Sequence, residues 1–233
     1  MMLRVFKYVA AFASIALLAG CARFPAGPAP QAVREMSFSI EFSGPINDNY
    51  YYFVPIDTDG GGYGPVPVFP GITTGEGWLI TSTLIPEADY HQTMYYVEYH
   101  QRQYTIFKVT HIQPFQSELV GAPVRSTIPE IGSKTLQFTL DLDSIGATND
   151  SVDVNVITTD QPVSGVRLLD GLGQTGNDYL TIDILTSRTI TNSEGLLPEM
   201  AGDVMDQNMT FQPKNEQTDP LDITDWSITV ENG

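Results

Sequence analysis

Two aspartates on a glycine-rich stretch are the residues whose types and spacing suggest chemistry most directly. Asp57 and Asp59 flank Thr58 and precede Gly60-Gly61-Gly62. Alternating carboxylates on a sharply bent loop can direct their oxygens at one hard cation, and calcium takes such oxygens at about 2.4 Å. Asp57 and Asp59 are therefore the predicted metal ligands, with calcium as the one candidate cofactor.

The calcium pattern is incomplete in the local sequence. Gly61 stands where a third acid or an asparagine would extend it, and Val68 stands where a final glutamate ligand would be. Asn47, Asp48 and Asn49 could complete the shell if the flanking strands bring them close. The alternative is an Asp-Gly turn whose carboxylates accept hydrogen bonds from nearby backbone N–H groups.

The common catalytic and cofactor-binding motifs are absent from the sequence or lack the structural context that they require. No serine lies in a G-x-S-x-G pattern, and His91, His100 and His111 match neither H-E-x-x-H nor a zinc cluster. The string Gly171–Gly176 satisfies G-x-G-x-x-G, but dinucleotide binding needs a helix to follow it. The alternating residues Asp178–Ile184 predict a strand instead. We expect the glycines to form a hairpin loop, and no catalytic residue is assigned.

Hydrolysis or binding of carbohydrate remains an alternative function. With 28 acidic residues in the chain, some carboxylate pair will fall by chance within the spacing of about 5 to 10 Å that glycoside hydrolases use. The sequence singles out no such pair. Tyrosines could also form a flat sugar platform, although tyrosine in strands is more often half-buried packing. The candidates are Tyr50, Tyr52, Tyr90, Tyr95, Tyr96 and Tyr99.

The N-terminal segment predicts export from the cytoplasm. Arg4 and Lys7 are the only charges before Cys21, and the rest of the segment Val5–Leu18 is almost entirely apolar or small. A secretory signal peptide has a basic N-terminal region, a short apolar core and small residues before its cleavage site. The apolar run is too short to span a bilayer comfortably, since that takes about 20 residues. We therefore expect a signal peptide over residues 1–20.

The end of this segment carries a more specific signal. Leu18-Ala19-Gly20-Cys21 resembles the lipobox of bacterial lipoproteins. The resemblance implies cleavage between Gly20 and Cys21, a diacylglycerol thioether on Cys21, and a fatty acyl group such as palmitate on its amino group. By the sorting habit of that family, Ala22 implies the outer membrane of a Gram-negative cell, on its periplasmic or surface face.

Lipidation also explains an otherwise isolated thiol. Cys21 is the only cysteine in the chain, so no intramolecular disulfide can form in an oxidising compartment. Two or three acyl chains would hold the protein firmly, because each buried CH₂ is worth about 0.8 kcal/mol.

The remainder of the chain is strongly acidic. The sequence has 11 Lys and Arg against 28 Asp and Glu, and loss of Arg4 and Lys7 with the signal peptide takes the formal charge from −17 to −19. Such a surface repels phosphate backbones and anionic headgroups, which makes nucleic acid a poor partner. The expected partners are the membrane, through the N-terminal lipid, and an envelope protein or a polysaccharide.

Two regions follow the signal peptide. Residues 21–35 hold the lipidated cysteine and a Pro/Ala-rich linker, which at about 3.1 Å per residue could stand a domain ~40 Å off the membrane. Residues 36–233 are predicted to form a single domain, long enough to bury a core without disulfides.

Short segments with two-residue periodicity dominate this domain. Apolar and polar residues alternate in Met36–Phe42, Leu136–Leu142, Val152–Val156 and Leu180–Ile184. This alternation is typical of antiparallel strands that bury one face, so we expect the polar alternates to face water. No long helical period occurs. We therefore predict an all-β fold, an antiparallel β-sandwich of about nine or ten strands.

One of the predicted hairpins has unusual turn chemistry. The apolar segments Met94–Tyr99 and Tyr104–Val109 flank His100–Gln103. Two-residue hairpin turns favour glycine and asparagine, and this turn has neither.

A loose resemblance supports the sandwich. Tyr51–Asp59, followed by a glycine-rich loop and Gly64-Pro65-Val66-Pro67-Val68, is similar to extracellular β-sandwich modules of the DOMON and carbohydrate-binding kind. No function is carried over from it. The leading prediction is a lipid-anchored, non-catalytic structural or interaction module of the cell envelope. The alternative is a carbohydrate- or calcium-binding module on the same scaffold, and an acid-pair hydrolase ranks below both.

Overall fold

The computed structural model describes residues 33–58, 64–67, 76–78, 94–112, 115–161, 168–172, 179–194, 197, 201–206 and 210–233. They belong to one compact unit, Val33–Gly233. The predicted signal peptide, the lipobox with Gly20 and Cys21, and the linker up to Ala32 lie outside the described residues. The first strand begins at Arg34, two residues before the predicted start of the domain at Met36. No helix among the described residues is long and apolar enough to cross a membrane.

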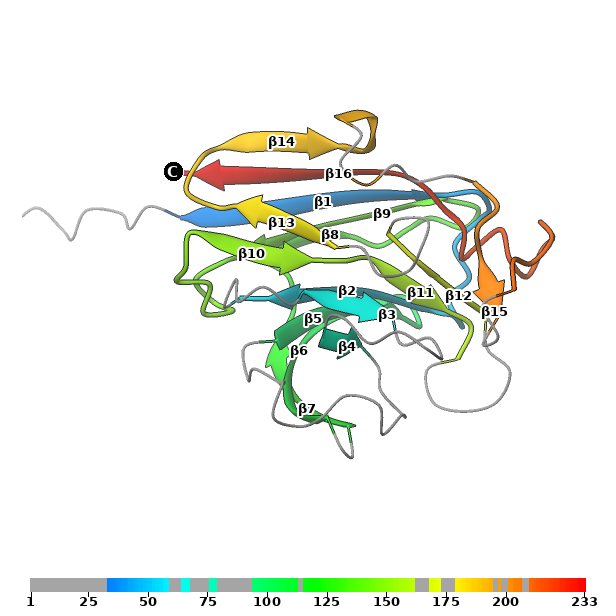
Figure 1. Cartoon of the computed structure of the whole chain (residues 1–233), viewed down its shortest axis with the longest axis horizontal. Helices are drawn as coiled ribbons and strands as arrows, with labels where there is room; N and C mark the ends of the chain where they lie inside the picture. The colour runs from blue at the N-terminus through cyan, green and yellow to red at the C-terminus, as the bar shows by residue number, and fades with distance from the viewer. Residues whose placement is uncertain are drawn as a thin grey trace, which may run out of the picture. The chain divides into compact units, whose positions relative to one another are not determined.

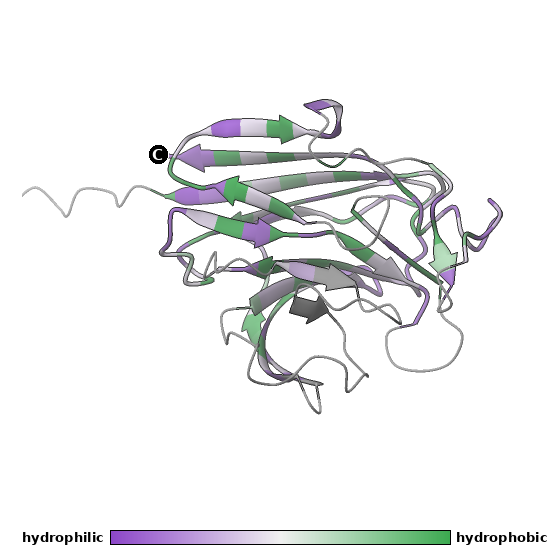
Figure 2. Ribbon diagram, viewed as in Figure 1, coloured by the Kyte–Doolittle hydropathy of each residue, from purple (hydrophilic) through white to green (hydrophobic). Residues whose placement is uncertain are grey.

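The predicted all-β sandwich is confirmed, and Figure 1 shows its two main sheets. The first sheet is antiparallel, with the strand order β14-β16-β1-β9-β8. Its strands are β1 (Arg34–Phe42), β8 (Arg125–Thr127), β9 (Thr135–Asp141), β14 (Arg188–Thr191) and β16 (Ile223–Asn232). The alternation predicted for β1 is confirmed, because Met36, Phe38, Ile40 and Phe42 are all buried. Figure 2 shows the same alternation of polar and apolar residues along β16.

The second sheet has nine strands, in the order β15-β12-β11-β2-β5-β6-β7, with β10 pairing both β2 and β13. They are β2 (Tyr51–Asp57), β5 (Met94–His100), β6 (Gln103–Ile112), β7 (Phe115–Gly121), β10 (Ser151–Val154), β11 (Ile157–Thr159), β12 (Leu168–Gly171), β13 (Leu180–Asp183) and β15 (Met205–Asp206). Two further strands, β3 (Pro65–Pro67) and β4 (Glu76–Trp78), form a parallel pair, and a 3-10 turn spans Asn192–Glu194. The described part of the chain has sixteen strands rather than nine or ten because several are only two to four residues long.

Aromatic contacts join the two sheets in the core. Phe42 of β1 meets Tyr52 of β2 edge-on, with ring centroids 5.1 Å apart. Tyr104 of β6 lies 5.6 Å from Phe138 of β9, which in turn stacks on Phe38 at 4.8 Å. Aromatic pairs at such separations add about 0.5–1.5 kcal/mol each beyond the burial of their area. The main hydrophobic core therefore lies between the inner faces of the sheets.

Parts of the outer face of the nine-stranded sheet are covered. The polar residues there were expected to face water, and that expectation is wrong. Asp153 and Asn155, the polar alternates near the end of β10, are 2% and 0% exposed. The Asn155 side-chain amide donates a 2.9 Å hydrogen bond to the carbonyl of Pro65, so β3 lies over this region. Thr181 donates a 2.6 Å hydrogen bond to the Asp153 carboxylate. The strands of this sheet also form a second buried apolar cluster with their own side chains, which are Phe53, Met94, Tyr96, Val109, Ile157, Leu169 and Met205.

The glycine-rich string Gly171–Gly176 does not close a hairpin, which corrects that prediction. β12, before it, pairs with β11, and β13, after it, pairs with β10. Since β12 and β13 have different neighbours, the segment connects two separate positions in the sheet. The strand predicted after the glycines is confirmed as β13.

The hairpin predicted around His100–Gln103 is confirmed. β5 and β6 pair up to His100 opposite Gln103, which leaves a two-residue turn. Gln101 and Arg102 both take positive φ angles, 49° and 63°. Positive φ at both central positions is the geometry of a type I′ turn, which matches the twist of the flanking strands.

Candidate functional site

The predicted calcium ligands lie only partly within the described structure. Asp57 ends β2 and is 0% exposed, whereas Asp59 lies outside the described residues. Asp57 stands opposite Asp153 in the register of β2 and β10. The turn Asn47–Asn49 precedes β2, so a seven-residue strand, about 20 Å long, separates it from Asp57. The turn therefore cannot complete a coordination shell around Asp57.

The described histidines do not come together. His100 ends β5 and stacks on Tyr51, with ring centroids 3.9 Å apart. His111 is exposed near the far end of β6. His91 lies outside the described residues.

The described tyrosines do not form a sugar platform, and this part of that hypothesis is wrong. Tyr52 and Tyr99 belong to the main core, Tyr96 belongs to the second apolar cluster, and Tyr50 and Tyr95 pack against the main core. Tyr52, Tyr96 and Tyr99 are buried, Tyr50 and Tyr95 are half-buried, and Tyr90 lies outside the described residues.

The outer face of the five-stranded sheet carries two rows of short polar side chains, here called the hydroxyl face. One row crosses the strands through Thr189, Thr229, Ser37, Thr139 and Arg125. The next row runs through Thr191, Ser227, Ser39, Gln137 and Thr127. The two-residue strand period places both rows on the side opposite the core. All members except Arg125 and Gln137 are serine or threonine.

Hydrogen bonds between neighbouring strands order this face. Ser37 and Thr139 lie 2.9 Å apart through their hydroxyl oxygens, and Thr189 and Thr229 lie at the same distance. Such cross-strand hydroxyl pairs fix rotamers that would otherwise be free. A shallow hollow of about 370 Å³ lies over the rows, lined mainly by their serines and threonines. Arg125 forms an ion pair with Glu35 at its edge.

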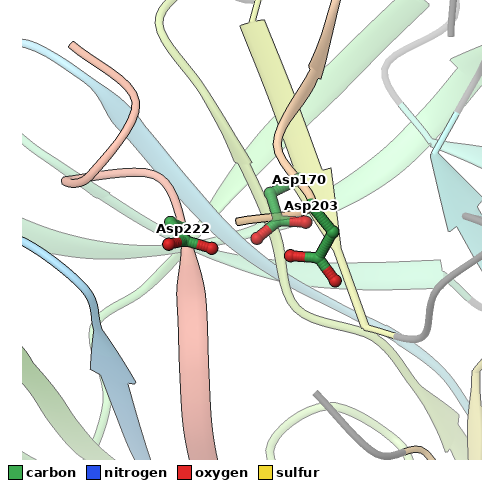
Figure 3. Close-up of side chains that lie close together, drawn as sticks. All are labelled: Asp170, Asp203 and Asp222. Carbon is green, nitrogen blue, oxygen red and sulfur yellow. The ribbon is translucent and has the colours of Figure 1, made fainter. Parts of the chain in front are cut away.

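Apart from the hydroxyl face, three aspartates from distant parts of the chain lie close together, as Figure 3 shows. Asp170 lies in β12, Asp203 precedes β15, and Asp222 directly precedes β16. One carboxylate oxygen from each lies within 4.8 Å of the other two. The side chains are nearly inaccessible, since the residues are 2%, 9% and 1% exposed. We call this group the aspartate cluster.

Backbone N–H groups hold two of the three carboxylates in place. The Asp170 oxygens accept from Gly171 N at 2.9 Å and from Ile223 N at 2.8 Å. Asp222 accepts a 2.7 Å bond at Oδ1 from Gly202 N, and its Oδ2 lies 3.4 Å from Lys214 Nζ. Neither oxygen of Asp203 has a hydrogen-bond donor among the described residues. The cluster thus presents one buried carboxylate whose charge is not met by a donor.

The pKa of Asp203 is raised to about 6, chiefly because the carboxyl group is buried and also because the charge of Asp222 lies nearby. The positive charge of Lys214 acts in the opposite direction and lowers this pKa. A proton on Asp203 could be donated to Asp222. The cluster therefore needs a compensating positive charge, which can come from a proton or from a bound cation.

Sequence reasoning missed the aspartate cluster because its members are 33 and 19 residues apart in the chain. The one local signal is an acid inside an apolar strand, as in Leu168-Leu169-Asp170. The hydroxyl face had a clearer signal, because Ser37 and Ser39 alternate with the core residues of β1.

Comparisons of the chain with protein-family models, with curated proteins and with solved structures found no match. The functional assignment therefore depends on the sites themselves.

Proposed function

We propose that this chain is a lipid-anchored lipoprotein of a bacterial cell envelope, and that its β-sandwich is a non-catalytic module that binds neutral polysaccharide on the hydroxyl face. The observation that carries the binding proposal is the pair of polar rows across all five strands of one sheet. The lipobox ending at Cys21 supports the anchor.

The chemistry of the hydroxyl face favours a glycan over a protein partner. Serine and threonine hydroxyls both donate and accept hydrogen bonds, as do the hydroxyls of a sugar. Protein interfaces instead concentrate aromatic residues, methionine and arginine at their centre. The described side chains of the two rows contain one arginine and no aromatic residue. A ligand rich in hydroxyl groups therefore suits this face better than a protein partner does.

The charge of the surrounding surface favours neutral glycans over anionic ones. Glu41 and Asp225 line a second hollow of about 260 Å³ beside the rows. Together with the formal charge of −19 expected after removal of the signal peptide, they would repel an anionic polysaccharide and tolerate a neutral one.

Single-site affinity should be weak, because the rows offer hydrogen bonds without aromatic stacking. Many copies anchored in one membrane would bind a long polymer together, and such linkage can raise avidity by about 10²–10⁴. A lipid anchor and a weak glycan site therefore fit one function.

Binding is tested by titrating the full chain with a panel of neutral oligosaccharides of glucose, mannose, galactose and N-acetylglucosamine, followed by NMR. We expect shifts in the amide signals of the two rows with at least one sugar. Ser39→Lys, which places a long side chain in the middle of the face, should abolish them. Thr148→Lys, at an exposed position in another part of the domain, is the matched control. If no sugar in the panel shifts these signals, or if Ser39→Lys binds as well as the wild type, the proposed ligand is wrong.

Anchoring is tested separately with radiolabelled palmitate in bacterial cells. The wild type should incorporate label and fractionate with membranes, and Cys21→Ala should do neither. Equal labelling of the two proteins would refute the anchor and leave the glycan experiment unaffected.

A further inference from the structure

We propose that Asp170, Asp203 and Asp222 bind a divalent cation of the size of calcium. This site is independent of the proposed glycan face. It also differs from the local calcium pattern at Asp57 and Asp59, because its ligands come from three separate segments (Figure 3).

The spacing of the carboxylates matches a single ion. Calcium binds oxygen at about 2.3–2.6 Å, so two ligands on opposite sides of it lie about 4.8 Å apart. All three candidate oxygens lie within 4.8 Å of one another. Magnesium holds its ligands at about 2.0–2.1 Å in a near-ideal octahedron, and it usually keeps several of its waters. Carboxylates, which can bind through one or both oxygens, suit the larger and less demanding ion.

Asp203 supplies the second, independent observation that points to a ligand. It is 9% exposed, it lies in the cluster, and neither of its oxygens has a donor among the described residues. Buried polar groups in folded proteins are nearly always hydrogen-bonded. A cation between the carboxylates would give the Asp203 carboxylate the partner that no described donor supplies.

Lys214 is the one basic residue of the described structure that forms an ion pair with the cluster, and it compensates only part of the charge. Its Nζ lies 3.4 Å from Asp222 Oδ2, and its side chain is 48% exposed. Three carboxylates and one ammonium leave two negative charges. A divalent cation would balance them.

The backbone contacts preorganise the site. Asp170 uses both oxygens to accept from backbone N–H groups, and Gly202 N holds Asp222. A carboxylate oxygen has two lone pairs, so these bonds orient the ligands without exhausting them. Fixed ligands reduce the ordering that cation binding would otherwise require.

The position of the cluster predicts what the cation does. Asp170 belongs to the nine-stranded sheet, Asp222 leads into β16 of the five-stranded sheet, and Asp203 lies in the long connection between β14 and β16. One ion would therefore tie both sheets to this connection. We infer a structural cation that stabilises this end of the sandwich.

The test is calcium titration of the full chain after removal of metal, followed by calorimetry and thermal unfolding. At about 100-fold excess over Kd, a single site should raise Tm by roughly 5–10 °C. Asp203→Asn should abolish the heat and the Tm shift. The metal-free variant should be at least as stable as the metal-free wild type, because it removes an uncompensated charge. Glu216→Gln removes an exposed acid from the same connection and should leave both signals unchanged.

Two outcomes would overturn the proposal that a cation binds at this cluster. One is a wild type without heat or Tm shift, which would show that a proton shared between Asp203 and Asp222 is the only compensation. The other is a calcium response in Asp203→Asn equal to that of the wild type. A larger shift with magnesium than with calcium would refute the assignment to calcium.

Discussion

Tyr99 donates a 2.7 Å hydrogen bond through its hydroxyl to the carboxylate of Asp48, 51 residues earlier in the chain. The same aspartate accepts from Arg102 at 3.2 Å, and its backbone carbonyl accepts from Gln101 N at 2.8 Å. Asp48 therefore holds the β5–β6 turn, whose two central residues lack the glycine or asparagine usual in such turns. Burial is the main cause that raises the pKa of Tyr99, and its bond to Asp48 acts in the same direction.

Asp48→Ala should destabilise the domain by about 1–3 kcal/mol, because it leaves the buried Tyr99 hydroxyl without its acceptor. Tyr99→Phe should cost about 1 kcal/mol, and the double variant should cost clearly less than the sum of the two. Urea unfolding of the four proteins measures this coupling. Strictly additive effects would show that the bond contributes nothing to stability.

Gln101→Gly should stabilise the domain by about 0.5–1 kcal/mol. Gln101 has a φ of 49°, which glycine adopts without steric cost, and its bond to Asp48 uses the backbone N–H that glycine keeps. Gln103→Gly, two residues later in a regular strand, is the control and should be destabilising. A loss of stability in Gln101→Gly would show that glutamine takes this positive φ angle without a steric cost.

Glu98→Gln should stabilise the domain at neutral pH and have no such effect in acid. Burial raises the pKa of Glu98, with His100 opposing it. The folded protein therefore holds the proton more tightly than the unfolded chain. This favours folding most at low pH, and the benefit is lost as pH rises through the folded-state pKa.

The difference in stability between Glu98→Gln and wild type should therefore grow from about zero in acid to a constant at neutral pH. Urea midpoints measured from pH 3 to pH 8 give this difference. Glu130→Gln, at an exposed position, serves as the control. A constant difference across the range would show that the ionisation of Glu98 is not linked to folding.

Lys214→Met should tighten calcium binding by about 3- to 10-fold. It removes a positive charge near the proposed ion, and the repulsion between even two unit charges at about 4 Å is worth about 1 kcal/mol at the dielectric constant of water, which is about 5-fold in Kd. Calorimetric titration of the metal-free variant measures the change in Kd. Weaker binding would show that Lys214 helps to build the site rather than competing for it.

The class of fold was predictable because strand periodicity is a local property. In β9, in Met36–Phe42 of β1 and in Trp226–Val230 of β16, every second side chain is apolar, and each of these segments buries that side in the core. The hydroxyl face follows from the same pattern, since residues opposite the core tend to meet solvent, and only Thr139 of the two rows is buried.

Pairing and burial on the second sheet could not be predicted in this way. Asp153 and Asn155 have the spacing of solvent-facing residues, but Asn155 binds the backbone of β3, which local sequence does not place there. The glycines after β12 have the composition of a hairpin loop, and only the sheet order shows that they join separate positions.

The sequence by itself determined the acidic charge and the alternating strands, and it predicts an export signal and a lipobox at Cys21, because each of these depends on residues close together in the chain. Only the tertiary structure decided which acids meet. Asp57 and Asp59 are neighbours in sequence, yet the carboxylates that converge are those of Asp170, Asp203 and Asp222, brought together where the two sheets and their connection pack. Three carboxylates that repel one another come together only because the rest of the domain packs around them. The packing energy of the domain, together with a bound proton or cation, must offset this repulsion.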